Sequence, residues 1–485
     1  MGFIHTQPKP VTTTKNLRIM KPFSKDTYIQ RRSELKRRVG SGLLLFLGNG
    51  EAPMNYADNT YHFRQDSSFH YFFGSDYAGL AAVIDIDNDI EVIFGNELTI
   101  DDIVWMGYQP SLHEKCELVG ISHTMPLADL ATCVKTAQSK GQTIHFLPPY
   151  RGEHQVWLQE LLGINPAEQA AKASLTMIQA IVDMRNHKTA EEIEHIEAAV
   201  DVSVDMHLAA YRAARPGVTE AQIAAEVERA CLSQDCYKAF PTIATVKGQT
   251  LHQHKFMNTL EPGQIFLLDA GAEDPMHYAG DLSSSMPVSD HFTPQQEMIY
   301  NLHLKTFKAA TDTLAPGVPF RQAHMNAAVC LCEGMKEIGL MKGDPVDAAY
   351  SGAYAMFFPC GLGHMMGLDV HDMENLGEQY VGYADGEKKS TQFGFKSLRL
   401  ARKLEPGFVF TVEPGIYFIP ELIDKWRAEH QFTDFICYDK LEAWKGFSGL
   451  RNELDYLITA DGARVLGHKK KPMTIEEVYA AKNAL

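Results

Sequence analysis

The sequence predicts an α/β (α+β) protein in two parts, an amino-terminal α/β domain followed by a second domain with an internal pseudo-two-fold repeat. The first third alternates short apolar segments with turns, and long amphipathic helical patterns begin near residue 166. One strand-and-turn motif then occurs twice in the second part. The 485 residues exceed what one ordinary core accommodates, so we expect domains at 25–170 and 180–470.

The amino-terminal part shows strand signals. Residues 42–47 are almost entirely apolar and end at a Gly-Asn-Gly turn. Two further apolar runs, 80–86 and 91–94, flank Asp87-Asn88-Asp89, a sequence typical of a tight turn. The two runs are therefore predicted to form a β-hairpin.

The change to helices is marked by a capping box at Thr189-x-x-Glu192, followed by apolar residues at helical spacing. A second box, Thr219-x-x-Gln222, follows a Pro-Gly-Val turn at 216–218. We place the boundary between the two domains in the stretch 165–185.

The repeated motif reads EPGQIFLLDAG at 261–271 and EPGFVFTVEPG at 405–415. Each copy is a turn, an apolar strand, a carboxylate at the end of the strand and a glycine turn. Each is preceded by a helix, a Pro-Gly-Val turn (216–218 or 316–318) and another helix. The pattern predicts two related halves, each of which brings an acidic side chain to one place.

Composition excludes several classes of partner. The formal net charge is −16 and no Lys/Arg-rich stripe is present, which argues against nucleic acid and anionic membranes. Residues 1–22 contain no apolar signal-peptide core, and no apolar run is long enough to span a bilayer. The eight cysteines are scattered without CxxC pairs, so we expect reduced thiols in a cytoplasmic protein.

Carboxylates at the ends of buried strands point to a metal site, since an unpaired buried charge is costly. Asp269 and Glu413 end the two repeated strands, Asp281 follows the first, and Glu453 lies in Gly-Leu-Arg-Asn-Glu. His364, in GLGHMMGLDVHD, supplies an imidazole. Each residue alone is a weak signal, but four carboxylates and one histidine without thiolate suit Mn²⁺, Co²⁺ or Zn²⁺.

With these motifs in view, the chain resembles the pita-bread metallopeptidases, in the branch formed by aminopeptidase P and prolidase. The resemblance covers about residues 30–465 and is strongest in DAG…AGD, GLGHMMGLDVHD, LEPGFVFTVEPGIYF and GLRNELD. It implies that the protein binds two divalent metal ions, with Mn²⁺ as the first choice. The ligands that it implies are Asp269 and Asp281 on one ion, His364 and Glu413 on the other, and Asp269 and Glu453 as bridges.

The resemblance also implies roles around these ligands. Glu413 would carry the proton from water to the leaving proline nitrogen, and His371 would stabilise the oxyanion. His371 and His252 would contact the substrate, whereas we expect neighbouring His254 to be structural. Arg451 would orient the ligands from behind them.

Several positions depart from the family pattern, Cys360 and Leu454 among them. Cys360 stands beside the ligands where the family has histidine, and Leu454 replaces an acidic residue. A neutral thiol neither donates as strongly as imidazole nor shuttles protons as well. The five expected ligands are intact, so these departures bear on rate and substrate preference.

The branch of the family depends on Arg399. Its segment, SLRLAR at 397–402, resembles the one by which prolidases hold the terminal carboxylate of a dipeptide, although it is also compatible with a surface arginine. The overall layout favours an Xaa-Pro aminopeptidase, with Xaa-Pro dipeptidase (prolidase) as the alternative. The resemblance further implies a proline-containing peptide as substrate and a homodimer or higher homo-oligomer.

The five expected ligands disfavour two remoter functions. A non-catalytic pita-bread binding protein would have lost metal ligands, and all five are present here. A metal-independent C–N hydrolase of creatinase type would not need them.

Overall fold

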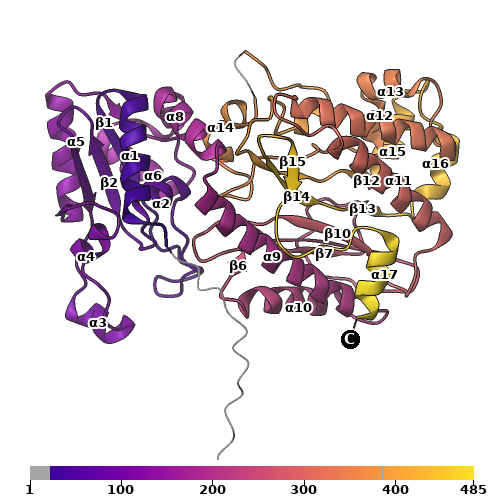
Figure 1. The fold of residues 1–485 in the computed structure, drawn as a ribbon, viewed down its shortest axis with the longest axis horizontal. Helices are drawn as coiled ribbons and strands as arrows, with labels where there is room; N and C mark the ends of the chain where they lie inside the picture. Colours follow the sequence, from indigo (N-terminus) through magenta and orange to yellow (C-terminus); the bar gives the residue numbers. More distant parts are fainter. Residues whose placement is uncertain (1–21, 384–385, 485) are drawn as a thin grey trace, which may run out of the picture.

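The computed structural model describes residues 22–383 and 386–484. The stretch 1–22, on which the prediction of no signal peptide rests, lies outside the described residues except for Pro22. The two parts of the chain lie side by side, the amino-terminal part on the left of Figure 1 and the larger second part on the right.

The amino-terminal part is built on a five-stranded sheet of order β4-β3-β2-β1-β5. The predicted hairpin is confirmed, since β2 pairs antiparallel with β3. The strands are β1 (Leu43–Leu47), β2 (Ala81–Asp85), β3 (Ile90–Phe94), β4 (His123–Met125) and β5 (Ile144–His145). The helices are α1 (Lys25–Val39), α2 (Ser67–Phe73), α3 (Ile100–Met106), α4 (Leu112–Glu117), α5 (Leu130–Ser139) and α6 (Gly152–Leu162).

Strand β1 is apolar throughout because both faces of this sheet are covered. Leu43 and Leu45 pack in one apolar cluster with Val134 of α5. The alternate residues Leu44 and Phe46 belong to a second cluster, which extends into the rest of the molecule. A strand buried on both faces loses the usual alternation of polar and apolar residues, as the sequence shows here.

Helices α7 (Pro166–Lys172) and α8 (Leu175–Asn186) lead into α9 (Ala190–Ala213) and α10 (Glu220–Leu232). Both predicted capping boxes are confirmed. The side chains of Thr189 and Thr219 accept from the backbone of Glu192 and Gln222, and those residues accept in return from the cap backbone.

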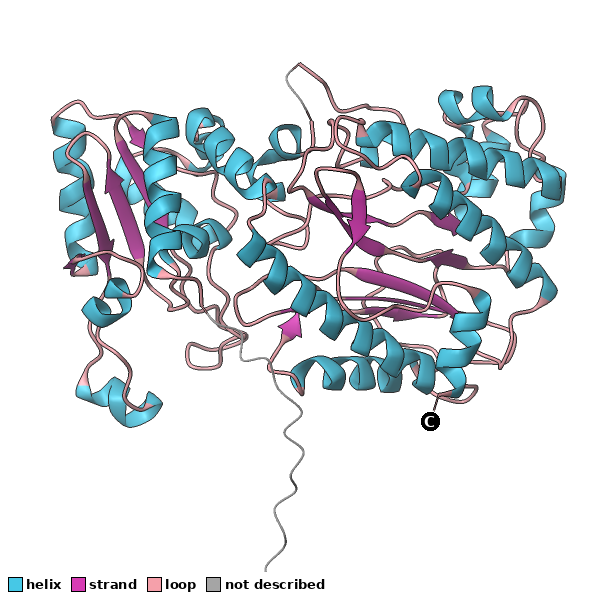
Figure 2. Cartoon of the chain, viewed as in Figure 1, coloured by secondary structure: helices cyan, strands magenta, loops and turns pink. Residues whose placement is uncertain are grey.

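The predicted repeat is confirmed as two similar halves. In the first, α9 and α10 precede a sheet of order β10-β8-β7, and in the second, α11 and α12 precede a sheet of order β11-β14-β15. Helices lie around these strands in Figure 2. The elements are β7 (Ile243–Thr245), β8 (Ile265–Ala270), β10 (Leu282–Pro287), α11 (Pro294–Thr311), α12 (Phe320–Ile338), β11 (Val409–Val412), β14 (Leu454–Ile458) and β15 (Ala463–Val465).

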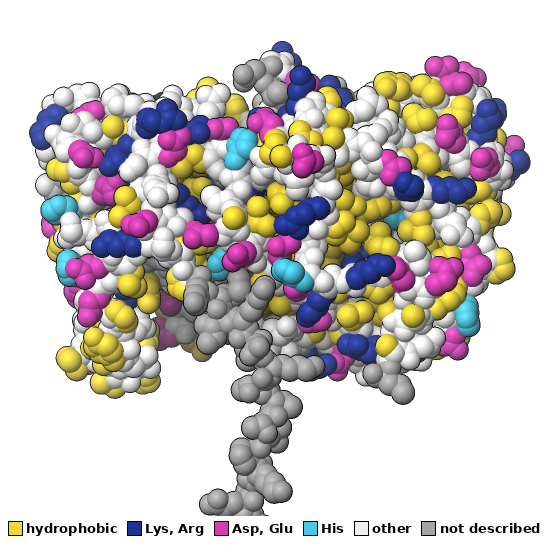
Figure 3. Space-filling model, viewed as in Figure 1, with side chains coloured by type: hydrophobic (Ala, Val, Ile, Leu, Met, Phe, Trp, Pro, Cys, Tyr) yellow, Lys and Arg dark blue, Asp and Glu magenta, His cyan; other side chains and the backbone are white. Residues whose placement is uncertain are grey.

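The remaining elements join or cover these halves. They are β6 (Tyr237–Lys238), β9 (Ala272–Glu273), α13 (Pro345–Ser351), α14 (Glu374–Val381), β12 (Gly415–Tyr417), α15 (Pro420–Ala428), α16 (Tyr438–Leu441), β13 (Gly449–Arg451) and α17 (Ile475–Asn483). On the face drawn in Figure 3, basic and acidic side chains are interspersed over both parts. Across the described ranges, no helix combines the length and the apolarity that a bilayer crossing requires.

Candidate metal centre

The first half of the repeat brings two aspartates to one edge of its sheet. Asp269 lies near the end of β8, opposite Ser283 of β10. Asp281 directly precedes β10, and its backbone N–H donates to Asp455 Oδ2 at 3.1 Å. Antiparallel pairing therefore holds the two acidic residues on neighbouring strands.

The second half contributes two glutamates in the same manner. Glu413 follows β11 and Glu453 precedes β14, and the adjoining residues Val412 and Leu454 are paired. The two sheets meet here, because the N–H of Glu453 donates to the carbonyl of Ser283 at 3.1 Å. The pseudo-symmetry predicted from the repeat thus brings all four carboxylates together.

His364 reaches the same place from the loop before α14. The N–H of Thr411 donates to its carbonyl at 3.0 Å, and its own N–H donates to Thr411 Oγ1 at 3.2 Å. Its Nδ1 donates to the carbonyl of Met365 at 3.1 Å, which leaves Nε2 toward the carboxylates.

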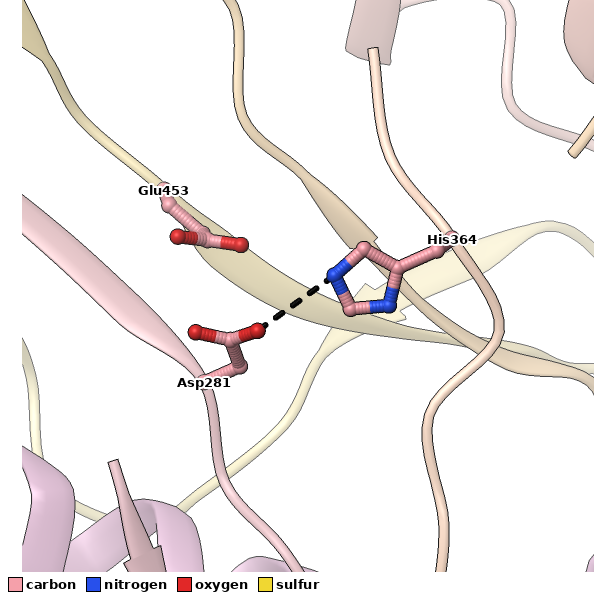
Figure 4. Close-up of side chains that lie close together, drawn as sticks. All are labelled: Asp281, His364 and Glu453. Carbon is pink, nitrogen blue, oxygen red and sulfur yellow. Dashed lines mark ion pairs between the residues drawn. The ribbon is translucent and has the colours of Figure 1, made fainter. Parts of the chain in front are cut away.

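The distances are those of a metal-binding cluster. The side chains of Asp281, His364 and Glu453 point toward one another (Figure 4). One ligand atom from each lies within 4.8 Å of the others. His364 Nε2 is 3.4 Å from Asp281 Oδ2 and 3.5 Å from Glu413 Oε1. All five side chains expected to be ligands line one cavity.

The electrostatics of this cluster fit a bound cation. Burial, and then the neighbouring Asp269, raise the pKa of Asp281 to about 8. Burial likewise raises the pKa of Glu413 and of Glu453. Among the described residues, Asp269 Oδ1 and Glu453 Oε1 are buried without a hydrogen-bond partner. Buried acceptors that nothing in the chain satisfies fit hard or borderline divalent ions.

The guanidinium of Arg451 contacts the carboxylates. It is buried, and its Nη2 donates to Asp269 Oδ2 at 2.5 Å. Its Nε donates to Ser283 Oγ at 2.8 Å and its Nη1 to Tyr417 Oη at 2.7 Å. These contacts orient Asp269, and Arg451 also lines the cavity beside the ligands.

Sequence reasoning missed three supporting residues. Ser283 Oγ donates to Glu453 Oε2 at 2.8 Å, Tyr417 accepts from Arg451, and Asp455 holds the backbone before β10. A signal for Ser283 was available, since a run of three serines (283–285) within a buried strand needs polar partners. No comparable signal marks Tyr417.

The cavity above the carboxylates has a volume of about 250 Å³. His252, His371 and Arg399, the residues expected to contact substrate, line it together with Cys360. His254 lines it as well, with its ring centroid 6.2 Å from that of His252. The geometry therefore does not separate the two histidines as the sequence analysis did.

Cys360 adjoins the acidic cluster as a protonated thiol. Burial, followed by the charge of Glu413, raises its pKa to about 12. Leu454, the other departure from the family pattern, is half-buried at the start of β14.

His371 is held by a partner that sequence reasoning did not identify. Its Nδ1 donates to Glu374 Oε2 at 2.5 Å, and its ring centroid lies 4.1 Å from that of His364. Glu374 also lies 3.5 Å from Arg399 Nε. One carboxylate thus contacts two of the residues expected to bind substrate.

The loop that carries His371 is anchored by the amino-terminal part. Arg64 Nη2 donates to the carbonyl of Leu368 at 2.6 Å, and Ser67 Oγ donates to Asp369 Oδ1 at 2.5 Å. Arg185 pairs with Asp369 at 2.8 Å and with Asp372 at 2.6 Å. These buried and half-buried contacts hold the loop on both sides of His371.

Two family models match the chain. The model of metallopeptidase family M24 matches residues 194–460, and the model of the aminopeptidase P N-terminal domain matches residues 28–146. Both ranges fall within the parts that the structure separates.

Known relatives of both activities are similar over most of their length. Human Xaa-Pro dipeptidase is 30% identical over 455 residues, 91% of this chain and 89% of that protein. A protein named "Probable Xaa-Pro aminopeptidase PEPP" from Uncinocarpus reesii is 28% identical over 451 residues, 90% of this chain and 89% of that protein.

Solved structures share the fold. Aminopeptidase PepP of Pseudomonas aeruginosa superposes with a TM-score of 0.77 at 24% identity, covering 95% of this chain and 98% of the other. Zinc-substituted aminopeptidase P of E. coli in complex with product gives a TM-score of 0.77 at 23% identity, covering 95% and 99%. The predicted pita-bread fold with its preceding α/β domain is confirmed.

Proposed function

This chain belongs to metallopeptidase family M24, in the branch of Xaa-Pro peptidases formed by aminopeptidase P and prolidase, and from this premise we propose that it is an Xaa-Pro aminopeptidase. It removes the first residue from peptides that have proline in second position. The observation that carries the proposal is the group of four buried or half-buried carboxylates and buried His364 that line one cavity.

We propose that this group holds two divalent ions, Mn²⁺ first and Co²⁺ or Zn²⁺ as alternatives. Asp269, Asp281, His364, Glu413 and Glu453 would hold these ions. The unsatisfied oxygens of Asp269 and Glu453 support this assignment. Such ions act as Lewis acids toward the scissile carbonyl and lower the pKa of water.

Glu413 acts as the general base and then as the general acid. Its carboxylate takes a proton from the attacking water and delivers it to the proline nitrogen as that nitrogen leaves. Burial raises the pKa of Glu413 above that of an exposed glutamate. Thr411 Oγ1, 3.4 Å from Glu413 Oε1, limits its rotation.

His371 stabilises the oxyanion that forms on the scissile carbonyl. Glu374 accepts from its Nδ1 and so orients the ring, and this hydrogen bond opposes the burial and the neighbouring His364, which lower the pKa of His371. His252, at the cavity wall, contacts the substrate, and Arg451 keeps Asp269 in position.

The alternative activity is that of an Xaa-Pro dipeptidase. Arg399 lines the cavity, where a guanidinium could grip the terminal carboxylate of a dipeptide. The similarity to human Xaa-Pro dipeptidase also favours this candidate.

The test compares two substrates on the purified, Mn²⁺-loaded protein. Amino-acid release from an Xaa-Pro-Xaa peptide supports the aminopeptidase, whereas proline release from an Xaa-Pro dipeptide alone supports the dipeptidase. Cleavage of neither substrate, with two ions demonstrably bound per chain, would refute the proposal.

We also propose that the protein works in the cytoplasm as a homodimer or higher homo-oligomer. All eight cysteines lie in the described ranges and are free thiols, which suits a reducing compartment. Helix α3 and the loop after it expose an apolar group, Ile100, Val104, Trp105, Met106 and Tyr108, with Trp105 87% exposed. Light scattering of the native protein and of the Trp105→Ser variant tests whether this surface joins subunits.

A further inference from the structure

Arg399, the residue expected to hold a substrate carboxylate, already faces two carboxylates of the chain itself. Glu374 Oε2 lies 3.5 Å from its Nε and Glu378 Oε1 lies 3.3 Å from the same atom. The backbone turns between these two glutamates at Gly377, whose φ of 114° is a conformation that glycine adopts readily.

The charges around Arg399 can be assigned in pairs. Lys389 forms an ion pair with Glu378. The carboxylate of Glu374 therefore offsets the guanidinium of Arg399. The hydrogen bond from His371 lowers the pKa of Glu374 to about 2, although burial opposes this, so Glu374 is ionised at neutral pH. An arginine compensated in this way attracts an incoming carboxylate weakly.

Glu374 lines a larger cavity that adjoins the site cavity at His371. A cavity of about 720 Å³ lies between the amino-terminal part and the second part, and His371 and Glu374 line it. His371 lines the site cavity as well. At about 250 Å³, the site cavity is smaller than the roughly 300–1,000 Å³ usual for ligand pockets, whereas the adjoining space has room for more of a peptide.

From these observations we propose that Glu374 is a specificity-determining residue, whose carboxylate offsets the charge of Arg399 and so selects peptides that continue beyond proline over free Xaa-Pro dipeptides. This inference rests on the proposed function and names its substrate class. A dipeptide presents a carboxylate directly after proline, whereas a longer peptide presents a neutral amide there.

The test isolates that carboxylate with matched ligands. Affinities of proline and prolinamide for the Mn²⁺-loaded protein are measured by calorimetry, and kcat/KM is measured for Ala-Pro and its amide. In Glu374→Gln both carboxylate-to-amide ratios should rise about sevenfold, from Coulomb's law for charges about 7 Å apart at an effective dielectric of about 40. Glu421→Gln, an exposed glutamate on α15 outside the cavity lining, is the matched control and should leave both ratios unchanged.

A second variant separates specificity from the support of His371. Glu378→Gln removes a charge beside Arg399 without touching His371 and should raise the ratios in the same direction. Unchanged ratios in both variants, or ratios that move toward the amide, would overturn the inference. A loss of turnover shared equally by all substrates in Glu374→Gln, with unchanged ratios, would show that Glu374 acts on His371 alone.

The affinities of proline and prolinamide test the role of Glu374 whether or not the protein cleaves proline peptides. If the unaltered protein cleaves no proline peptide, the proposed function fails, and the proline-to-prolinamide affinity ratio still decides the role of Glu374.

Discussion

Metal removal should make the folding stability of this protein fall as the pH rises, because of Asp281. In the metal-free protein burial, and then Asp269, raise its pKa to about 8, whereas an unfolded aspartate titrates near ~3.9. Between these values the folded state holds a proton that the unfolded state has released. The contribution of Asp281 to the free energy of unfolding is therefore at its full value below about pH 4 and is lost as the pH rises through 8.

The size of the loss follows from the same two pKa values. Each pH unit within the window costs about 1.4 kcal/mol, and the slope flattens near the folded pKa. From pH 6.5 to 8, Asp281 alone should contribute a loss of about 1.5 kcal/mol. Glu413 and Glu453, whose pKa values burial also raises, act in the same direction. Divalent ions bind the deprotonated carboxylates, so the Mn²⁺-loaded protein should lose less.

The assay is scanning calorimetry of chelated and Mn²⁺-loaded protein between pH 6.5 and 8, with Asp281→Asn as the control. Other buried groups titrate too, among them His207, whose pKa burial lowers to about 3, and Lys471, whose pKa burial lowers to about 7. The difference between the chelated parent and chelated Asp281→Asn removes their shared contribution. Equal pH slopes for these two proteins would refute the reasoning.

The remaining predictions concern turnover on Xaa-Pro-Xaa peptides. Glu413→Gln should keep the circular dichroism spectrum and lower kcat by about 10²–10⁴; an active variant would remove Glu413 from the proton role. Cys360→His should keep or raise kcat, because imidazole exchanges protons near neutral pH and this thiol does not; a collapse of activity would mean that the site depends on the thiol. His371→Ala should lower kcat by about 10²–10³ with a smaller change in KM, and an unaltered kcat would exclude oxyanion stabilisation. Tyr417→Phe, which removes a partner of buried Arg451, should cost about 1–3 kcal/mol of stability in thermal unfolding, and an unchanged midpoint would count against that contact.

Much of the fold could be predicted because local signals and the repeat agree. The capping boxes at Thr189 and Thr219 begin α9 and α10, and β8 and β11 occupy the two repeated motifs. The carboxylates were recognisable because Asp269 and Glu413 end apolar strands, where an uncompensated charge is costly.

What could not be predicted depends on contacts between distant segments. Ser283 joins Glu453 and Arg451 across 170 and 168 positions of the chain, and sequence spacing carries no information about such pairs. Glu374 is different, since it is only three residues from His371. Its role comes from the turn at Gly377 and from Arg399, both of which require the folded loop.

The contacts of Arg64 and Ser67 with the loop before His371 limit how this protein can be recombined. A chimera that exchanges residues 28–146 for the equivalent piece of a relative loses the contacts that hold this loop, even where both parts fold. The loop stays in place only if the donor supplies the same two contacts. A working chimera therefore needs the amino-terminal part and the loop 368–372 from the same parent, although the two segments match different family models.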